Sequence, residues 1–371
     1  MSKILKKNTK GVNSGLTESV KRRHLEQLAA FRDTQLRPHP RLRLLFIEMT
    51  ELCNEHCRHC GSECGEYILP NRLKTEEIKA FLQSVKEDFD LSDIQLCITG
   101  GEPLLREDFF EIMAYANELG FHWGMTSNGT LITETVAEKL YQCGMKTASI
   151  SVDGLQESHE WFRQSPSYEE TIEGVRNLLK YPFQHIQITT VIHSRNIGEM
   201  EEMYRQFTAL GVRSWRLVNI EPMGRAKRQP ELLLERGQMI KVLDFIKEKR
   251  FAGKMEVAYG CSHYLGTEYE RELRPWYFIC NAGVYTASLT AGGDFVSCLD
   301  LPRRPELIEG NVRKDRFKDV WEKGYRIFRT DYRKKGKCAD CPHYRFCAGD
   351  SFHSWDFEKN EPMMCLRGIL F

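Results

Sequence analysis

The chain has 371 residues, with 53 basic against 52 acidic side chains and 13 cysteines. This length suffices for one large domain and a smaller one, and the balanced charge gives no argument for nucleic acid or an anionic membrane as a partner. No segment reaches the ~18 apolar residues of a membrane span, and the first residues lack the apolar core of a signal peptide. We therefore expect a cytoplasmic protein whose cysteines stay reduced and available to metal.

Residues 1–40 form a basic N-terminal arm that precedes the first strand. Residues 17–33 are predicted to form an amphipathic helix, with an apolar face made of Val20, His24, Leu28 and Phe31. The basic run at residues 21–23 is expected to be a solvated face, with docking to a partner as the alternative. Pro38 and Pro40 break the chain before the first strand.

A regular alternation of strands and helices follows from residue 42. Strands are predicted at 42–49, 94–98, 121–126, 147–152, 185–192 and 212–220, and helices at 75–89, 106–119, 132–143, 168–180, 196–210 and 232–249. Six strand–helix units in sequence favour parallel strands with right-handed crossovers. The predicted fold is α/β, a partial (β/α)6 barrel over residues 41–250 with its chemistry at the carboxyl ends of the strands.

The alternation stops after residue 250. A bridging segment at 251–275 leads to residues 276–371, which carry six cysteines, several glycines and aromatics, and little predicted regular structure. We expect a small irregular C-terminal domain that is organised by metal rather than by a large core.

The first predicted strand runs directly into a cysteine loop. Cys53, Cys57 and Cys60 form a C-x3-C-x2-C pattern. Three thiolates this close can hold one iron–sulfur cluster, and a four-iron cluster then keeps one iron without a protein ligand. The alternatives are zinc, which usually takes a fourth ligand, and scattered core cysteines. Cys64 lies outside the motif and is not expected to be a ligand.

Short motifs follow the other strands. Thr99-Gly-Gly-Glu-Pro103 comes after the second strand, residues 126–129 (Thr-Ser-Asn-Gly) after the third, 149–154 (Ser-Ile-Ser-Val-Asp-Gly) after the fourth and 222–226 (Pro-Met-Gly-Arg-Ala) after the sixth. In this order, behind the cysteine loop, they resemble the radical SAM superfamily over residues 42–226. Members of that family bind S-adenosylmethionine (AdoMet) at the open iron of a 4Fe–4S cluster.

The resemblance gives roles to individual residues. Cys53, Cys57 and Cys60 would hold the cluster, and the AdoMet amine and carboxylate would bind its open iron. The residues expected near AdoMet are Gly100, Gly101 and Glu102 on the amine side, Ser151 and Asp153 at ribose or carboxylate groups, Arg163 at the carboxylate, and Asn128. A surface ion pair is the alternative for Arg163, and a tight turn is the favoured alternative for Asn128.

The chemistry implied is reductive cleavage of AdoMet to a deoxyadenosyl radical, which abstracts hydrogen from a C–H bond. A flavodoxin- or ferredoxin-type protein would donate the electron. The cofactors supply the difficult step, and the protein contributes positioning and exclusion of water.

The C-terminal cysteines resemble the SPASM extension of radical SAM enzymes that modify peptides and proteins. Four of them match the outer auxiliary cluster of that family: Cys338, Cys341, Cys347 and Cys365. For the inner cluster the chain offers Cys280 and Cys298, with Cys261 as a possible third ligand, because Ser351 stands where the family pattern has a cysteine. The alternatives there are an open iron, a two-iron cluster, an oxygen ligand from Asp350 or Ser351, or no cluster; we expect a cluster with incomplete cysteine ligation.

Three further residues have separate interpretations. Asp300, two residues after Cys298, is a candidate general base that would take a proton as a substrate radical loses its electron, or else an exposed turn residue. Cys97 and Cys143 are expected to be packing residues.

The residues and motifs are compatible with three functions. The first is an enzyme that oxidatively modifies a peptide or protein by a cross-link, a thioether or a related change. The second is a SPASM-type oxidase of a small molecule such as a tetrapyrrole or cofactor precursor. The third is a binding protein built on a zinc ribbon, which C-x2-C and two later cysteines would also allow.

Overall fold

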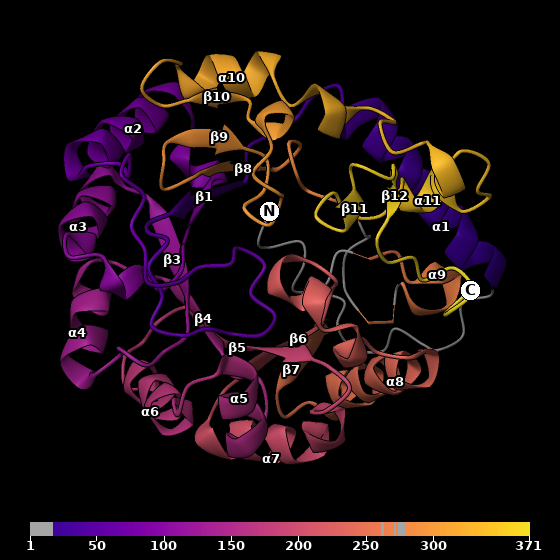
Figure 1. Ribbon diagram of the computed structural model, residues 1–371, viewed down its shortest axis with the longest axis horizontal. Coiled ribbons are helices and arrows are strands. Elements are labelled where there is room, and N and C mark those ends of the chain that lie inside the picture. The colour runs from indigo at the N-terminus through magenta and orange to yellow at the C-terminus, as the bar shows by residue number, and fades with distance from the viewer. Residues whose placement is uncertain (1–17, 261–262, 271, 274–278) are drawn as a thin grey trace.

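The computed structural model describes residues 18–260, 263–270, 272–273 and 279–371, so Cys261 lies outside the described residues. A single ten-stranded sheet, in the order β10-β9-β8-β1-β2-β3-β4-β5-β6-β7, curves around the middle of the molecule (Figure 1). The six predicted strands are β1 (Leu44–Glu48), β2 (Gln95–Thr99), β3 (His122–Ser127), β4 (Thr147–Ser151), β5 (His185–Ile192) and β6 (Ser214–Asn219). All pair in parallel with their neighbours in sequence, as the partial barrel predicts.

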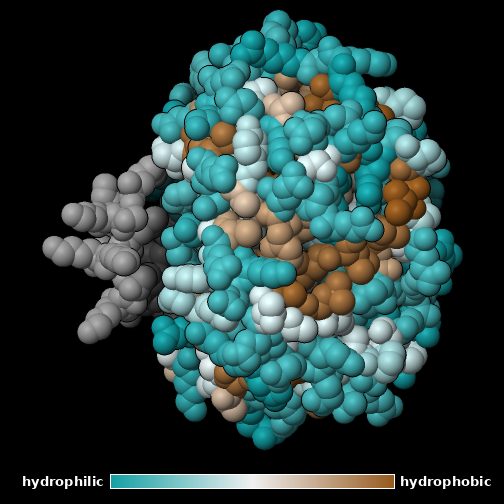
Figure 2. Space-filling view, turned by 90° about the vertical axis from the view of Figure 1, so that its left-hand side faces the viewer, coloured by the Kyte–Doolittle hydropathy of each residue, from teal (hydrophilic) through white to brown (hydrophobic). Residues whose placement is uncertain are grey.

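Helices surround this sheet on the outside (Figure 1). The predicted ones are α2 (Thr75–Asp88), α3 (Phe109–Leu119), α4 (Glu134–Gln142), α6 (Tyr168–Leu179), α7 (Met200–Leu210) and α8 (Arg236–Ala252). An unpredicted helix, α5 (Gln156–Arg163), stands between β4 and α6 and ends at Gln164, whose φ is +54°. Where α2, α3 and α4 face outwards, the surface is mostly hydrophilic, with an apolar patch near the middle of Figure 2.

The strands alternate between the helical layer and the inside of the barrel. In β2, Leu96 and Ile98 are buried, whereas Cys97 lies on the opposite face, is only partly buried and lines the interior cavity. The prediction that Cys97 is a core residue is therefore wrong, because the period of two in a strand turns it away from its apolar neighbours. Cys143 ends α4 and packs, partly buried, with its sulfur 3.8 Å from the carbonyl oxygen of Phe110.

The C-terminal region continues the barrel sheet. β7 (Glu256–Tyr259) adds a seventh parallel strand beside β6, and β8 (Thr286–Leu289) pairs in parallel with β1. β9 (Asp294–Val296) and β10 (Gly310–Asn311) extend this edge in antiparallel pairs. Beyond them the elements are short, as expected: α9 (Gly266–Tyr269), α10 (Phe317–Lys323), α11 (Tyr344–Cys347) and the pair β11 (Trp355–Asp356) and β12 (Glu361–Pro362).

The N-terminal helix α1 (Glu18–Phe31) forms as predicted, but with a different buried face. Leu25 and Ala29 are buried against Tyr264 and Phe346 of the C-terminal region, whereas Val20 is 43% exposed. Phe31 is 49% exposed, so the predicted face is wrong by about one residue per turn. The helix docks on its own chain, beside α9 and α11. None of the described helices is long and apolar enough to cross a membrane.

Candidate functional site

The cysteine loop follows β1 at the carboxyl end of the barrel strands. Burial raises the pKa of Cys53 to about 11 and also raises the pKa of Cys57. The charge of Cys60 contributes to raising both pKa values. A hydrogen bond from the Cys64 thiol lowers the pKa of Cys60 to about 6. Three sulfurs that share one loop and interact electrostatically are a donor set that fits a single iron–sulfur cluster.

Two glycine motifs brace the backbone of this loop. A Cβ at Gly101 would lie 2.0 Å from the carbonyl oxygen of Leu52, and a Cβ at Gly224 would lie 2.2 Å from that of Cys60. The side chain of Arg225 donates to the carbonyl oxygens of Cys57 (2.7 Å) and Cys64 (2.9 Å). The motifs after the second and sixth strands therefore fix the shape of the loop, which requires glycine at these two points.

Glu102 is completely buried, and its carboxylate is held by the turn after β3. Both carboxylate oxygens lie 3.0 Å from the Oγ of Ser127, and one also accepts from the backbone N–H of Asn128 at 2.9 Å. Burial raises the pKa of Glu102 to about 7. Gly100 and Gly101 make their close approaches to the backbone of residues 50–52. Contact of these three residues with the AdoMet amine stays a prediction.

Asn128 makes the turn interaction that was its favoured interpretation, and its contact with AdoMet stays a prediction. Its Oδ1 accepts from the backbone N–H of Thr130, which is the turn interaction, while its Nδ2 donates to the Oδ1 of Asn54 in the cysteine loop at 2.8 Å. The turn after β3 is thereby tied to the residue next to Cys53. Ser151 is the last residue of β4 and lies on the same face as Ser149, which lines the cavity.

Asp153 and Arg163 belong to a buried ion-pair cluster. The Asp153 carboxylate accepts from Arg163 Nε (3.0 Å) and from the backbone N–H of Val191 (2.8 Å), and Arg163 also contacts Glu55. Glu55 in turn accepts from Ser167 at 2.6 Å. Arg163 is 4% exposed, so the surface ion pair considered for it is a buried one. Burial raises the pKa of Asp153, but the charges of Arg163 and His59 and the hydrogen bond from Val191 together outweigh it and leave the pKa lowered.

His59, inside the cysteine motif, is a site residue that the sequence reasoning missed. Its ring stacks on Phe162 with centroids 4.2 Å apart, its Nε2 lies 3.9 Å from Asp153, and it lines the barrel cavity. The available signal was its place between Cys57 and Cys60.

The four cysteines predicted for the outer auxiliary cluster converge although they come from separate segments. Cys338, Cys341, Cys347 and Cys365 all line one cavity of about 360 Å³. Burial, with the added charges of Cys365 and Cys341, raises the pKa of Cys338 to about 11. Four converging thiols fit a four-iron cluster with complete protein ligation.

The inner set is less complete. Cys280 and Cys298 both line the barrel cavity. Asp350 faces elsewhere, because its carboxylate accepts from the ring of His263 (2.9 Å) and from the backbone N–H of Tyr264 (3.2 Å). Ser351 is fully buried. Instead, Asp300 and His353 lie beside Cys298, the carboxylate 3.8 Å from its sulfur.

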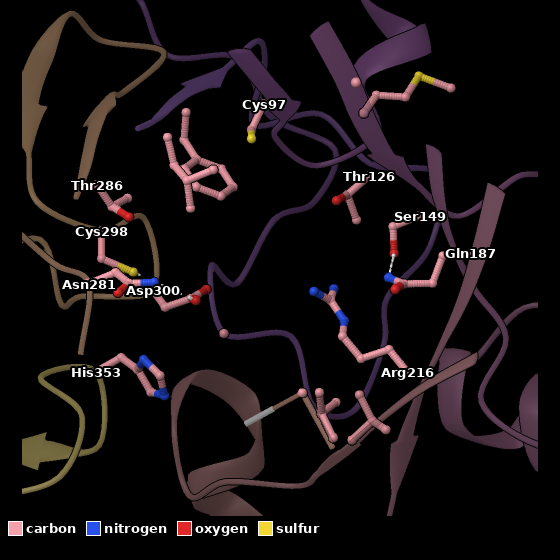
Figure 3. Close-up of a pocket in the computed structure, with 18 of the residues that line it drawn as sticks. Cys97, Thr126, Ser149, Gln187, Arg216, Asn281, Thr286, Cys298, Asp300 and His353 are labelled. Atoms are coloured by element: carbon pink, nitrogen blue, oxygen red, sulfur yellow. Dashed lines mark hydrogen bonds between the residues drawn. The ribbon is translucent and has the colours of Figure 1, made fainter. Parts of the chain in front are cut away.

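Cys280, Cys298, Asp300 and His353 line a cavity of about 650 Å³ inside the barrel. Figure 3 shows Thr126, Ser149, Gln187 and Arg216 on one side of it and Asn281, Thr286, Cys298, Asp300 and His353 on the other. The guanidinium of Arg216 projects towards the middle, and its stem passes over Gly260, where a Cβ would lie 2.5 Å from Cγ and Cδ. A Cβ at Gly61 in the cysteine loop would lie 3.9 Å from Asp300 Oδ1, so the loop also borders this cavity.

Comparison with known families decides the class. The radical SAM superfamily matches residues 47–207, and the SPASM iron-sulfur cluster-binding domain matches residues 280–342. The chain therefore carries a radical SAM domain followed by a SPASM domain. It is an enzyme with a SPASM domain, and these two domains imply 4Fe–4S clusters, the first of them with AdoMet. The interpretation as a zinc-ribbon binding protein is thereby set aside.

Similar proteins include enzymes of two kinds. The AdoMet-dependent heme synthase of Oleidesulfovibrio alaskensis is 29% identical to this chain, over 84% of this chain and 82% of that protein. The AdoMet-dependent heme synthase of Methanosarcina barkeri is 28% identical, over 88% of this chain and 97% of that protein. The mycofactocin maturase MftC of Mycobacterium tuberculosis is 26% identical over 81% of this chain and 76% of that protein.

Solved structures share the fold. Streptococcus suis SuiB bound to the precursor peptide SuiA superposes with a TM-score of 0.69 at 16% identity, over 100% of this chain and 85% of that one. The AdoMet-bound anSMEcpe superposes with a TM-score of 0.66 at 19% identity, over 84% and 90%. Both likenesses agree with the partial barrel and its C-terminal extension.

Proposed function

We propose that this enzyme oxidises a carboxylate-bearing substrate held in the barrel cavity, with Cys53, Cys57 and Cys60 binding the AdoMet cluster. When bound, that cluster and AdoMet supply one-electron cleavage chemistry that ends in abstraction of hydrogen from a C–H bond. Cys338, Cys341, Cys347 and Cys365 would hold the outer auxiliary cluster, which would supply an acceptor for the electron that the substrate gives up. The single observation that carries the proposal is the cavity itself, which reaches from the cysteine loop to the C-terminal region.

The cavity suits a compact anionic substrate. Its volume of about 650 Å³ falls within the ~300–1,000 Å³ of small-molecule sites. Arg216 lies on the same wall as the polar side chains of Ser149 and Gln187, and a guanidinium recognises a carboxylate by two parallel hydrogen bonds. The walls of the partial barrel also shield the reacting atoms from part of the solvent.

A tetrapyrrole with propionate side chains is the first candidate for this substrate. Its propionates are carboxylates that Arg216 would bind, and the macrocycle is a small molecule of the kind that a cavity of about 650 Å³ holds. The heme synthases also match this chain over most of both sequences. A ribosomally made peptide is the second candidate, because MftC, a maturase, matches 81% of the chain. In either case the AdoMet contacts would be made by residues 100–102, Asn128, Ser151, Asp153 and Arg163.

The test is an anaerobic assay of the reconstituted enzyme with AdoMet and either dithionite or a flavodoxin- or ferredoxin-type donor. Iron coproporphyrin III is the first probe, and a short peptide encoded beside the gene is the second. We expect 5′-deoxyadenosine to form together with a porphyrin that has lost carbon dioxide and two hydrogens for each propionate oxidised. Turnover of the peptide without turnover of iron coproporphyrin III would favour peptide maturation. Failure to form 5′-deoxyadenosine with any of the reductants would contradict the radical chemistry. The matched control is Cys60→Ala.

A further inference from the structure

One wall of the barrel cavity brings together a sulfur, an oxygen and a nitrogen donor. Cys298 Sγ, a carboxylate oxygen of Asp300 and a ring nitrogen of His353 all lie within 4.8 Å of one another. The first two are 3.8 Å apart, close to the ~3.5 Å that separates sulfur and oxygen ligands around one tetrahedral ion with bonds of about 2.3 and 2.0 Å. Figure 3 shows the three side chains on the same side of the cavity.

A second observation concerns the support behind His353. Its Nε2 lies 3.3 Å from an Oε of Glu221, so this carboxylate fixes the ring and leaves Nδ1 for the cavity side. Glu221 forms an ion pair with His263 at 3.0 Å, and the other nitrogen of His263 lies 2.9 Å from Asp350. The exposed fractions of these three supporting residues are 9% or less. A histidine that binds metal is almost always oriented by a carboxylate at its second nitrogen.

The spacing of the donors distinguishes a single ion from a cluster. Ligands on different irons of a four-iron cluster point away from its centre and therefore lie further apart than ligands that share one ion. The contact of 3.8 Å between Cys298 and Asp300 joins residues only two positions apart, as in a chelate around one ion. Cys280 lines the same cavity but does not belong to this group of three.

We propose that Cys298, Asp300 and His353 bind one divalent ion of the Zn²⁺ or Fe²⁺ type, with a fourth position open to the cavity. Mixed sulfur, nitrogen and oxygen donors suit such borderline ions, and three protein ligands with an open position characterise catalytic rather than structural sites. The three donors line the same cavity as Arg216, so an oxygen or nitrogen donor of a substrate bound there would complete the coordination. Binding of the ion does not depend on AdoMet chemistry.

The experiment uses Zn²⁺ as the probe on the anaerobically prepared, cluster-loaded enzyme. After equilibration and desalting, zinc, iron and sulfide are measured for each chain, and the zinc environment is read by X-ray absorption. We expect one zinc with a single sulfur at about 2.3 Å and lighter atoms at about 2.0–2.1 Å, with iron and sulfide unchanged. His353→Ala and Asp300→Asn should each weaken zinc binding more than ~100-fold, beyond the ~10–100-fold loss typical of outer partners.

The matched control is His185→Ala, which removes a histidine from another part of the same cavity and should leave zinc binding intact. Iron and sulfide contents that stay equal in all variants show that the chain still folds and holds its clusters. Zinc that persists in His353→Ala, a zinc with two or more sulfurs, or iron lost together with His353 would each overturn the single-ion site. Asp300→Asn that stalls product formation with zinc retained would also overturn it and return Asp300 to the role of general base.

Discussion

The Oγ of Ser127 lies 3.0 Å from both carboxylate oxygens of Glu102, so a buried acid joins the turns that follow β2 and β3. Burial raises the pKa of this acid to about 7, above an ordinary value of 4.5. A raised carboxyl pKa means that the folded chain holds a proton that the unfolded chain releases, so stability falls as pH rises from about 4.5 to 7.

Glu102→Gln should remove this part of the pH dependence. The shift corresponds to roughly 3 kcal/mol between pH 4.5 and pH 8, since one pKa unit is about 1.4 kcal/mol. Urea unfolding of the metal-free chain at several pH values measures this contribution as the difference in unfolding free energy between wild type and variant. The titration of the histidines is common to both proteins and cancels in this difference. Parallel pH profiles for the two proteins would contradict the assignment.

Replacing the cysteines one at a time should separate the two clusters. Cys57→Ala should remove the iron of the AdoMet cluster and abolish formation of 5′-deoxyadenosine. Cys341→Ala should remove the outer cluster and leave cleavage of AdoMet measurable. Cys97→Ala is the control, because this cysteine belongs to neither set of predicted ligands. Iron and sulfide analysis with electron paramagnetic resonance reads the result, and equal iron loss in all three would count against the ligand sets.

Arg163→Met should destabilise the chain strongly. It leaves the carboxylates of Asp153 and Glu55 buried without their cation, which costs about 3–5 kcal/mol. Arg176→Met is the control, because its pair with Glu173 is exposed and contributes at most ~0.5 kcal/mol. Denaturant unfolding measures both. Similar stability of the two variants, with AdoMet binding lost only in Arg163→Met, would point to a ligand role.

Leu25→Ala should loosen the contact between α1 and the C-terminal region. Its side chain is 1% exposed against Tyr264 and Phe346, so the cavity created costs about 2–4 kcal/mol. The same truncation at Val20, which is 43% exposed, should change the unfolding free energy by less than ~0.5 kcal/mol. Equal effects would restore the face that the sequence pattern indicated.

Arg216→Gln should weaken the binding of a carboxylate-bearing substrate. The loss of a bidentate charged contact in the cavity should raise KM by about tenfold to a hundredfold, because hydrogen bonds to charged groups contribute ~1.5–3 kcal/mol. Cleavage of AdoMet without substrate should persist. Arg213→Gln, an exposed residue just before the same strand, is the control. Steady-state kinetics with iron coproporphyrin III decide, and an unchanged KM would remove Arg216 from the substrate site.

The parts of this protein that could be predicted are those that local pattern specifies. Each predicted barrel strand lies within two residues of the observed one, because β-branched and apolar runs bounded by turn residues mark them. The convergence of Cys338 and Cys365 followed from family spacing and agrees with the shared cavity. Whether these residues bind clusters stays a prediction.

The parts that were missed depend on contacts distant in sequence. β8 is four residues long and exists because β1 offers it a partner, so its own pattern is too short to detect. His353 has no cysteine-like spacing, and only folding brings it to Cys298 and Glu221. The face of α1 was misjudged because its partners, Tyr264 and Phe346, lie far along the chain.

The pairing of β8 with β1 has a consequence for biosynthesis. During translation β1 emerges early, but its neighbour on that side becomes available only when the ribosome has made residue 289. Until then the backbone of β1 is an unpaired edge that can associate with other chains. Closing so distant a pairing is slow, so the nascent protein should depend on chaperones late in synthesis, and truncation before β8 should yield aggregates rather than a smaller barrel.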